Sequence, residues 1–179
     1  DPDELVALLA LIRRAQEEIG HRMFHSRYLQ AARRGIRAAS LLVGVQPGAL
    51  PRSLGEEIRA GAAERWEAID ETTLRLMVRQ VRQALQNGAD YAQIEAAILQ
   101  TLEMPTWRRQ MIADTELTWA YHKGALEVYD HNGVRQVIRN ELPTACPDCA
   151  ADNGAVYGIE EADNVLPAHP SCHGWWTPV

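Results

Sequence analysis

The chain has 179 residues, of which 46% are hydrophobic, so it can bury a core and is not intrinsically disordered. Its net charge of −6 at pH 7 excludes a protein that coats nucleic acid with its whole surface. Its three cysteines, an odd number, argue against a disulfide framework and favour a soluble protein made in a reducing cytosol.

Residues 3–43 contain no proline and repeat apolar residues at helical spacing, which predicts one long helix, or two helices that meet near Gly20 or Gly35. The apolar run 5–12 follows three acidic residues and precedes two arginines, the reverse of the charge order in a secretory signal peptide. The run is also far too short to span a membrane, so we expect no membrane partner.

Glycines and prolines predict a loop over residues 44–51. The next helix is expected to begin at a capping box formed by Ser53 and Glu56 and to end at the Asn-Gly pair 87–88. The predicted buried positions of this helix are Ile58, Ala62, Trp66, Ile69, Leu76 and Met77.

Two more helices are predicted before the chain changes character. Asp90 and Gln93 repeat the capping pattern for a short helix over residues 91–103. Pro105 suits the first turn of the following helix, 106–131, which ends at the Asn-Gly pair 132–133. The apolar positions of this last helix are Ile112, Leu117, Ala120, Tyr121, Leu126 and Tyr129.

After residue 133 the pattern becomes that of short strands and turns. "VRQVI" (134–138) alternates apolar and polar residues, and "GAVYGI" (154–159) is a second candidate strand. The chain ends in "GWWTPV", whose tryptophans are expected to be buried under this region rather than exposed for docking. The predicted fold class is therefore α+β, mostly α, with long helices followed by a small C-terminal β zinc knuckle of two or three strands over residues 140–176.

The prediction of a zinc knuckle rests on two pairs of residues that can bind a metal ion. In "TACPDCAADNG" (144–154) Cys146 and Cys149 are separated by two residues, and in "PAHPSCHG" (167–174) His169 and Cys172 have the same spacing. Zinc prefers four nitrogen or sulfur donors at the corners of a tetrahedron, and such pairs supply two donors from each turn. A segment this short buries too little surface to fold alone, which favours a structural Zn²⁺ ion held by all four residues.

Other kinds of site are less well matched. A redox C-x-x-C motif needs a βαβ fold, which nothing in the sequence indicates, whereas metal-free buried thiols stay open as an alternative. The nucleobase deaminases have P-C-x-x-C and an upstream H-x-E, but Ala145 precedes the first cysteine and no H-x-E occurs. His173 could replace a ligand, and His21 with His25 has a metal-binding spacing, although exposed histidines explain all three.

Positive charge is concentrated near the N-terminus. Residues 1–52 carry eight arginines against five acids, and residues 133–179 carry two arginines against six acids. The arginine run could contact phosphate or an acidic partner, or it could be a solvated helix face. The run comprises Arg22, Arg27, Arg33, Arg34 and Arg37.

Three segments in this order resemble the phage Mu F-like head morphogenesis family of minor capsid proteins. They are "IADTELTWAYHKGALEVYDHNGV" (112–134), "TACPDCAADNGAVYGI" (144–159) and "PAHPSCHG" (167–174), which together span about the C-terminal third of the chain. The matching positions are Ile112, Ala113, Thr115, Glu116, Tyr121, Gly124, Tyr129, Gly133, Val134, Cys146, Cys149, Asp152, Gly154, His169, Pro170 and Cys172. The chain departs from the family at Asp114, where arginine is frequent, at "LPTA" (142–145), and at Gly174, where a last cysteine is common.

The resemblance implies a helical N-terminal region, 1–104, followed by a head morphogenesis domain, 105–179. It implies a structural protein of a tailed phage or prophage virion, assembled in the bacterial host cytoplasm. Its partners would be the portal protein and capsid or scaffold proteins, with contact to packaged DNA, and it would have neither catalytic residues nor a small-molecule substrate. The alternatives are a metal-dependent nuclease or hydrolase and a nucleic-acid-binding module that uses the N-terminal arginine face.

Overall fold

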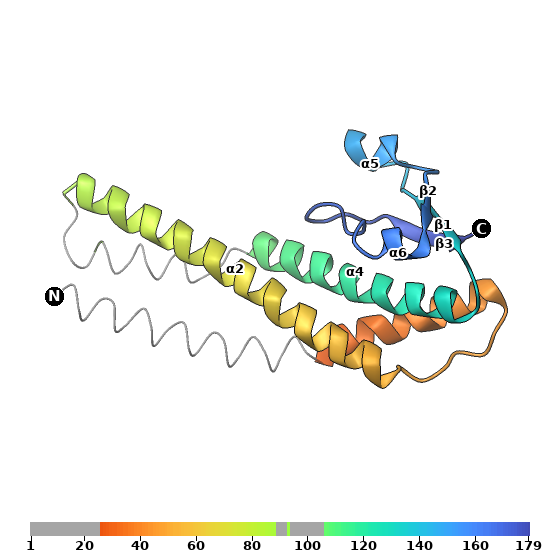
Figure 1. Cartoon of the computed structure of the whole chain (residues 1–179). Helices are drawn as coiled ribbons and strands as arrows, with labels where there is room; N and C mark the ends of the chain where they lie inside the picture. The colour runs from red at the N-terminus through yellow and green to blue at the C-terminus, as the bar shows by residue number, and fades with distance from the viewer. Residues whose placement is uncertain (1–25, 89–92, 94–105) are drawn as a thin grey trace. The chain divides into compact units, whose positions relative to one another are not determined.

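The computed structural model describes residues 26–88, 93 and 106–179 (Figure 1). A small antiparallel sheet follows long helices, so the predicted mostly helical α+β class is confirmed. None of the helices within the described ranges combines the length and apolar composition needed to cross a lipid bilayer. The elements are a helix over residues 26–43, α2 (Arg52–Gln86), α4 (Thr106–His131), β1 (Gln136–Asn140), α5 (Pro147–Ala151), β2 (Val156–Gly158), α6 (Ile159–Ala162) and β3 (Trp175–Pro178).

The chain divides into two compact units, one of Asp1–Met23 with Ala63–Arg109 and the other of Phe24–Ala62 with Gln110–Val179. In the first unit, the buried hydroxyl of Thr73 donates to the Ile69 carbonyl at 3.0 Å and accepts from Arg108 Nη2 at 3.4 Å. The second unit contains the sheet and the cysteine cluster. The domain boundary expected between residues 104 and 105 stays a prediction.

Most predicted helix ends agree with the structure. The helix over residues 26–43 passes through Gly35 without a break, and α2 ends just before Gly88, whose φ of +73° is left-handed. The capping box at Ser53 is wrong, because α2 already begins at Arg52 and the Glu56 carboxylate accepts from Arg52 Nε at 2.9 Å. The chain before residue 26, with Gly20, and nearly all of the 91–103 segment lie outside the described residues.

The predicted core positions are buried to different degrees. Ile58 of α2 is fully buried, and Ala120, Leu126 and Tyr129 of α4 are also buried. Partial burial is found at Ala62, Ile69, Leu76, Ile112, Leu117 and Tyr121. The side chains of Trp66 and Met77 lie outside the described part of the chain.

The helix over residues 26–43 and α4 touch backbone to backbone where they cross. A Cβ atom on Gly35 would overlap the carbonyl oxygen of Tyr121, and one on Gly124 would overlap that of Ala32. Both helices run in the same direction along the second unit (Figure 1). Because only glycine leaves room for this approach, the two glycines determine how closely the helices pack.

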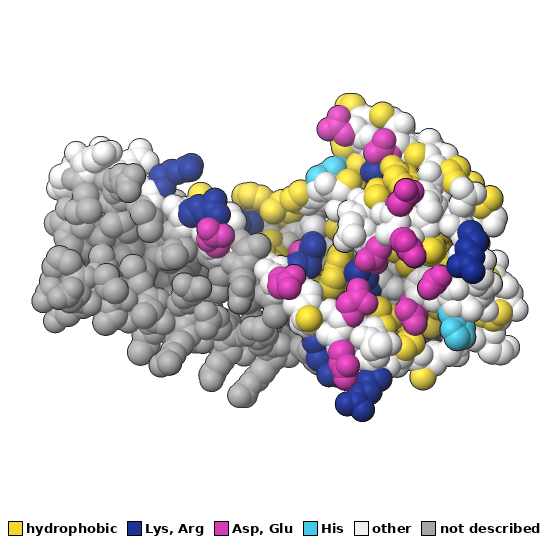
Figure 2. Space-filling model, in the orientation of Figure 1, with side chains coloured by type: hydrophobic (Ala, Val, Ile, Leu, Met, Phe, Trp, Pro, Cys, Tyr) yellow, Lys and Arg dark blue, Asp and Glu magenta, His cyan; other side chains and the backbone are white. Residues whose placement is uncertain are grey.

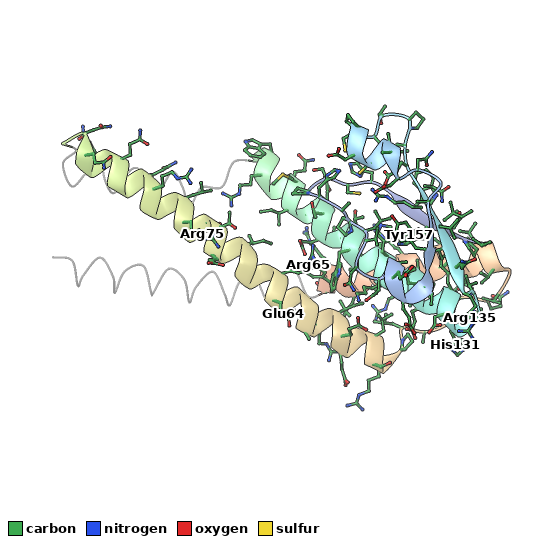
Figure 3. All side chains as sticks on the ribbon, turned by 45° about the horizontal axis from the view of Figure 1, so that its top comes forward. Glu64, Arg65, Arg75, His131, Arg135 and Tyr157 are labelled. Carbon is green, nitrogen blue, oxygen red and sulfur yellow. The ribbon has the colours of Figure 1, made fainter. Side chains whose placement is uncertain are left out.

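The C-terminus of α4 explains why the first strand begins later than predicted. The Val134 N–H bonds to the Tyr129 carbonyl at 3.0 Å and the Gly133 N–H to the Asp130 carbonyl at 2.9 Å, which is a Schellman motif with Gly133 at φ +77°. The strand expected from residue 134 therefore starts at Gln136. Figure 3 shows His131 and Arg135 at this corner, where the chain leaves the helix.

The sheet has the order β2-β1-β3, with both neighbours antiparallel to β1. Alternation along β1 turns Val137 and Arg139 inward, and alternation along β3 buries Trp176 but leaves Trp175 37% exposed. The expectation that both tryptophans are buried thus holds for only one of them. The Tyr129 hydroxyl donates to the Trp176 carbonyl at 3.2 Å, which ties β3 to α4.

Lys123 is a buried cation that joins separate parts of the second unit. Its Nζ atom donates to Glu57 of α2 at 2.7 Å and to Asp163, just after α6, at 2.5 Å. Burial alone would lower the pKa of Lys123, but the hydrogen bonds to the two carboxylates outweigh burial and raise it. The lysine therefore remains charged and holds α2, α4 and the α6 turn together.

His122 of α4 is buried and neutral in the folded chain. Burial lowers its pKa from 6.5 to about 4, an effect that the nearby Gly174 backbone opposes only in part. As the pH falls, the unfolded chain therefore takes up the proton first, so stability is complete above pH 6.5 and is lost towards pH 4. Protonation of His122 is therefore expected to lower the free energy of unfolding by up to about 3 kcal/mol.

The matched variant His122→Leu removes the titrating imidazole and replaces it with an apolar side chain of similar size. We expect urea unfolding of the wild type to weaken between pH 7 and pH 4 by up to about 3 kcal/mol more than that of the variant. The difference between the two proteins cancels the acid titration that they share. Equal acid sensitivity in both would show that His122 is solvated and protonates freely.

Candidate metal centre

The first pair of candidate ligands is placed by a one-turn helix. Cys146 is the N-cap of α5, Pro147 occupies its first turn, and the Cys149 N–H points to Cys146 Sγ at 3.5 Å. Proline fits this position because the N–H that it lacks would have no partner in the first turn. The turn brings the exposed thiol of Cys146 and the buried thiol of Cys149 to the same side.

The second pair is placed by a tight turn that is anchored on α4. The Cys172 N–H bonds to the His169 carbonyl at 3.1 Å, and Ser171 between them adopts a left-handed conformation with φ 58°. Such a backbone is unfavourable for serine and needs support from its surroundings. The Ser171 N–H donates to Thr115 Oγ1 of α4 at 2.9 Å, which supplies that support.

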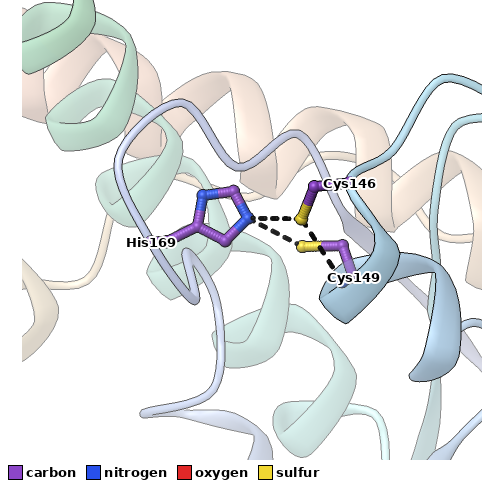
Figure 4. A group of neighbouring side chains, drawn as sticks. All are labelled: Cys146, Cys149 and His169. Carbon is purple, nitrogen blue, oxygen red and sulfur yellow. Dashed lines mark hydrogen bonds between the residues drawn. The ribbon is translucent and has the colours of Figure 1, made fainter.

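The donor atoms of the two turns meet at distances that suit a metal ion (Figure 4). His169 Nε2 lies 3.3 Å from Cys146 Sγ and 3.0 Å from Cys149 Sγ, and Cys149 Sγ lies 3.9 Å from Cys172 Sγ. A tetrahedral zinc ion separates two sulfur ligands by about 3.8 Å and a sulfur and a nitrogen ligand by about 3.5 Å. The cluster could therefore hold a metal ion such as zinc.

The imidazole of His169 is oriented as a ligand should be. Its Nδ1 atom lies 2.8 Å from the Pro170 carbonyl oxygen, to which it can only donate. The proton is then on Nδ1, and the lone pair of Nε2 points towards the two cysteines. Metal-binding histidines use the same arrangement, in which a backbone carbonyl fixes the tautomer.

The four predicted ligands do not form one symmetrical group. Cys146, Cys149 and His169 have donor atoms within 4.8 Å of one another, whereas Cys172 belongs to a second such group with Cys149 and Glu141. Cys149 is common to both groups. Cys172 thus joins the cluster through Cys149. The Glu141 carboxylate, which was not among the predicted ligands, lies beside them.

A buried arginine, Arg139 of β1, surrounds the cluster with hydrogen bonds. Its Nη2 donates to Cys149 Sγ at 3.2 Å, its Nε to Glu141 at 2.7 Å and its Nη1 to Asp152 at 2.7 Å. Three cysteine thiolates and one neutral histidine around Zn²⁺ leave a net negative charge. The guanidinium is positioned to balance that charge and to hold Cys149 in place, as outer-shell groups of metal sites do.

Proton affinities in the cluster differ between the exposed and buried thiols. The hydrogen bond from the Cys149 backbone, assisted by His169, lowers the pKa of Cys146. Burial raises the pKa of Cys149 to about 12, with neighbouring thiols adding to the effect. The hydrogen bond to the Pro170 carbonyl raises the pKa of His169. A bound zinc ion would favour the thiolate form of both cysteines.

Arg139 and Glu141 were not predicted from the sequence, although the alternation of the strand could have indicated Arg139. Alternation in β1 places Arg139 on the same side as buried Val137, but the strand was expected to end at residue 138. Glu141 is buried beside Gly174, where a Cβ atom would lie 2.5 Å from its Oε1. A side chain at position 174 would therefore displace the carboxylate that pairs with Arg139.

Replacement of Arg139 by methionine is expected to weaken zinc binding by roughly 10- to 100-fold, because Cys149, Glu141 and Asp152 lose a shared donor. The measurement is competition with a chromophoric chelator at pH 7. Arg135→Met is the matched control, since this arginine precedes the same strand but is exposed. An affinity loss equal in both variants would contradict a role for Arg139 in holding the ligands.

Three other histidines are candidate ligands by sequence. His173 is exposed and belongs to neither donor group, and His21 and His25 fall outside the described residues. No protein-family model, curated protein or solved structure matches this chain.

Proposed function

We propose that Cys146, Cys149, His169 and Cys172 bind one structural zinc ion. The observation that carries this proposal is the convergence of two tight turns on Cys149, whose buried thiol is shared by both donor groups. Structural zinc sites are closed by four protein donors, while catalytic sites keep one position open for water. The carboxylates of Glu141 and Asp152 both accept hydrogen bonds from Arg139, which makes them poor candidates for a general base.

The zinc ion would lock the knuckle onto α4. Cys149 and Cys172 belong to the same buried cluster as Tyr129 of α4, Val137 of β1 and Trp176 of β3. The metal would therefore stabilise a surface rather than supply chemistry to a substrate. This is a scaffold role, in which the second unit presents fixed side chains to other proteins.

We further propose that the chain is a minor capsid protein that acts in assembly of a tailed phage head at the portal vertex. Residues of the family resemblance in α4 support this, because they make the contacts that connect α4 to its surroundings. Thr115 bonds to the knuckle, Glu116 accepts from the Tyr28 hydroxyl at 2.9 Å, Gly124 allows the helix crossing and Tyr129 bonds to β3. A shared pattern in such positions is expected of proteins with a shared fold.

Two apolar side chains offer a contact surface for such partners. Leu41 and Leu42, at the end of the helix over residues 26–43, are 73% and 56% exposed. Acidic side chains lie scattered over the face of the C-terminal part that Figure 2 shows, in agreement with the charge asymmetry of the sequence. We expect portal or capsid proteins to contact Leu41 and Leu42.

The decisive experiment locates the chain in a particle. Antibodies against the chain, applied to purified virions from a lysogen that encodes it, are expected to label one vertex of the head at a few copies per particle. Virions that lack the chain entirely would overturn the assembly role. Metal analysis of the purified chain separately tests the zinc proposal, with about one zinc per chain expected and a metal-free, fully reduced chain contradicting it.

The alternative of a metal-dependent nuclease is tested with the same protein. We expect no cleavage of duplex or single-stranded DNA by the zinc-loaded chain. Cleavage that Cys149→Ala abolishes while the circular dichroism spectrum is unchanged would instead establish an enzyme.

A further inference from the structure

A cleft of about 700 Å³ lies within the second unit, beside the metal cluster but separate from it. The helix over residues 26–43 forms one wall, α4 forms the second, and the chain that enters β3 forms the third. Its volume falls within the range of small-molecule sites, roughly 300–1,000 Å³. The residues that line it and are used below are Arg27, Arg34, Asp114, His122 and Trp175.

The four described arginines of the arginine run fall into two groups. Arg27 and Arg34 are seven residues apart, two helical turns, so they lie on the same face and both line this cleft. Arg33 and Arg37 line a different cleft, next to the loop over residues 44–51. All four side chains are exposed, and within the described ranges no ion pair involves any of them.

A buried histidine also lines the cleft. His122 is 3% exposed, and both of its ring nitrogens are enclosed by protein atoms, so the side chain helps to form the wall of the cleft and does not itself bind a ligand.

An exposed aromatic ring completes the chemistry of the cleft. Strand alternation in β3 turns Trp175 outward while Trp176 is buried, and Trp175 then borders the same cleft as Arg27 and Arg34. Arginines beside an exposed indole match the requirements of a phosphate attached to a flat ring, since the base can stack on the indole while the phosphate meets the guanidinium groups.

We propose that this cleft binds a nucleotide unit, with its phosphate at Arg27 and Arg34 and its base on Trp175. The alternative, a segment of acidic peptide, uses the arginines but leaves the exposed indole of Trp175 without a role. Asp114 also lines the cleft, and its carboxylate can accept a hydrogen bond from a ring N–H or amino group of a base. The nucleotide could come from a free molecule or from a single strand of nucleic acid.

The test uses the full chain with its metal and a fluorescein-labelled oligodeoxythymidylate, followed by fluorescence anisotropy at low salt. Charge reversal in Arg27→Glu/Arg34→Glu is expected to weaken binding by at least about 10-fold. The matched control Arg33→Glu/Arg37→Glu makes the same charge change on the same helix but in the other cleft, and is expected to change binding by less than about 3-fold. Equal losses in the two double variants would overturn the proposal, because binding would then follow net charge alone.

Further variants test whether a base stacks on Trp175 and control for misfolding. Trp175→Ala is expected to weaken binding by about 10-fold and Trp175→Phe by much less, because phenylalanine still stacks. Arg27→Lys/Arg34→Lys keeps the charge and is expected to retain most of the affinity, which shows that the glutamate variants fail through charge. Circular dichroism and thermal unfolding confirm that each variant is folded. An unchanged affinity in Trp175→Ala would contradict base stacking.

Two ligands distinguish the sources of the nucleotide. Thymidine monophosphate, added as a competitor, is expected to displace the labelled strand if the cleft takes a single nucleotide. Displacement only by unlabelled strands would identify a strand-binding cleft, which also supports the proposal. Displacement by polyglutamate of equal charge at the same concentration would overturn it, as would the absence of any binding at low salt.

Discussion

Replacement of Cys149 by serine is expected to reduce zinc affinity by more than about 100-fold, since even the loss of an outer-shell group costs roughly 10- to 100-fold. Cys149 Sγ lies 3.0 Å from His169 Nε2, 3.9 Å from Cys172 Sγ and 3.2 Å from Arg139 Nη2, so all parts of the cluster depend on it. Loss of the ion is expected to open residues 140–176 before the helices unfold, because metal binding and folding of a small knuckle are coupled.

The measurement combines metal analysis with amide hydrogen exchange of residues 140–176. Asp148→Asn is the matched control, because Asp148 lies between the two cysteines in α5 but is exposed. The control is expected to bind zinc like the wild type. Full zinc occupancy in Cys149→Ser, or equal exchange protection with and without a strong chelator in the wild type, would contradict a structural metal site.

Replacement of Gly124 by alanine is expected to destabilise the chain by about 3 kcal/mol, although the same change normally stabilises a helix interior by about 1 kcal/mol. The added Cβ atom would overlap the Ala32 carbonyl oxygen, which belongs to the backbone of the facing helix. No rotation of a side chain can relieve this overlap, so the two helices must separate and lose contacts between them. Urea unfolding followed by circular dichroism measures the effect.

Gly55→Ala provides the matched control in another helix. The nearest atom to its added Cβ would be Leu50 Cδ2 at 3.7 Å, an ordinary contact, so this variant is expected to be as stable as the wild type or up to about 1 kcal/mol more stable. Gly35→Ala should behave like Gly124→Ala, because its Cβ would overlap the Tyr121 carbonyl oxygen. Similar stability of the Gly55 and Gly124 variants would show that the helices do not touch at this crossing.

Elements with strong local signals were predicted close to their observed ends. The Asn-Gly pairs after α2 and α4 end those helices where predicted, and each glycine has the left-handed φ that such an end requires. The start of α2 was misjudged, since Glu56 pairs with Arg52 instead of capping the helix with Ser53. Several polar side chains compete at a helix start, and sequence spacing does not show which pair forms.

Of the candidate metal site, the ligands were predictable from the sequence, but the groups around them were not. Two ligand pairs at knuckle spacing identify the donors, because each pair is held by a turn of a few residues. Arg139 was missed because its partners Glu141, Cys149 and Asp152 come together only when β1 and the α5 turn pack against each other. The exposure of Trp175 was missed because it depends on the register between β3 and β1.

The amino-acid sequence by itself determined the long helices, the two ligand pairs and the helix stops, since these depend on hydrogen bonds between residues a few positions apart. Tertiary structure alone decided how closely Gly35 and Gly124 let two helices approach, which groups Arg139 connects, and how four arginines of the run are divided between two clefts. These features involve side chains that are distant in the chain. Their contacts depend on the packing of whole elements, which no local pattern of residues encodes.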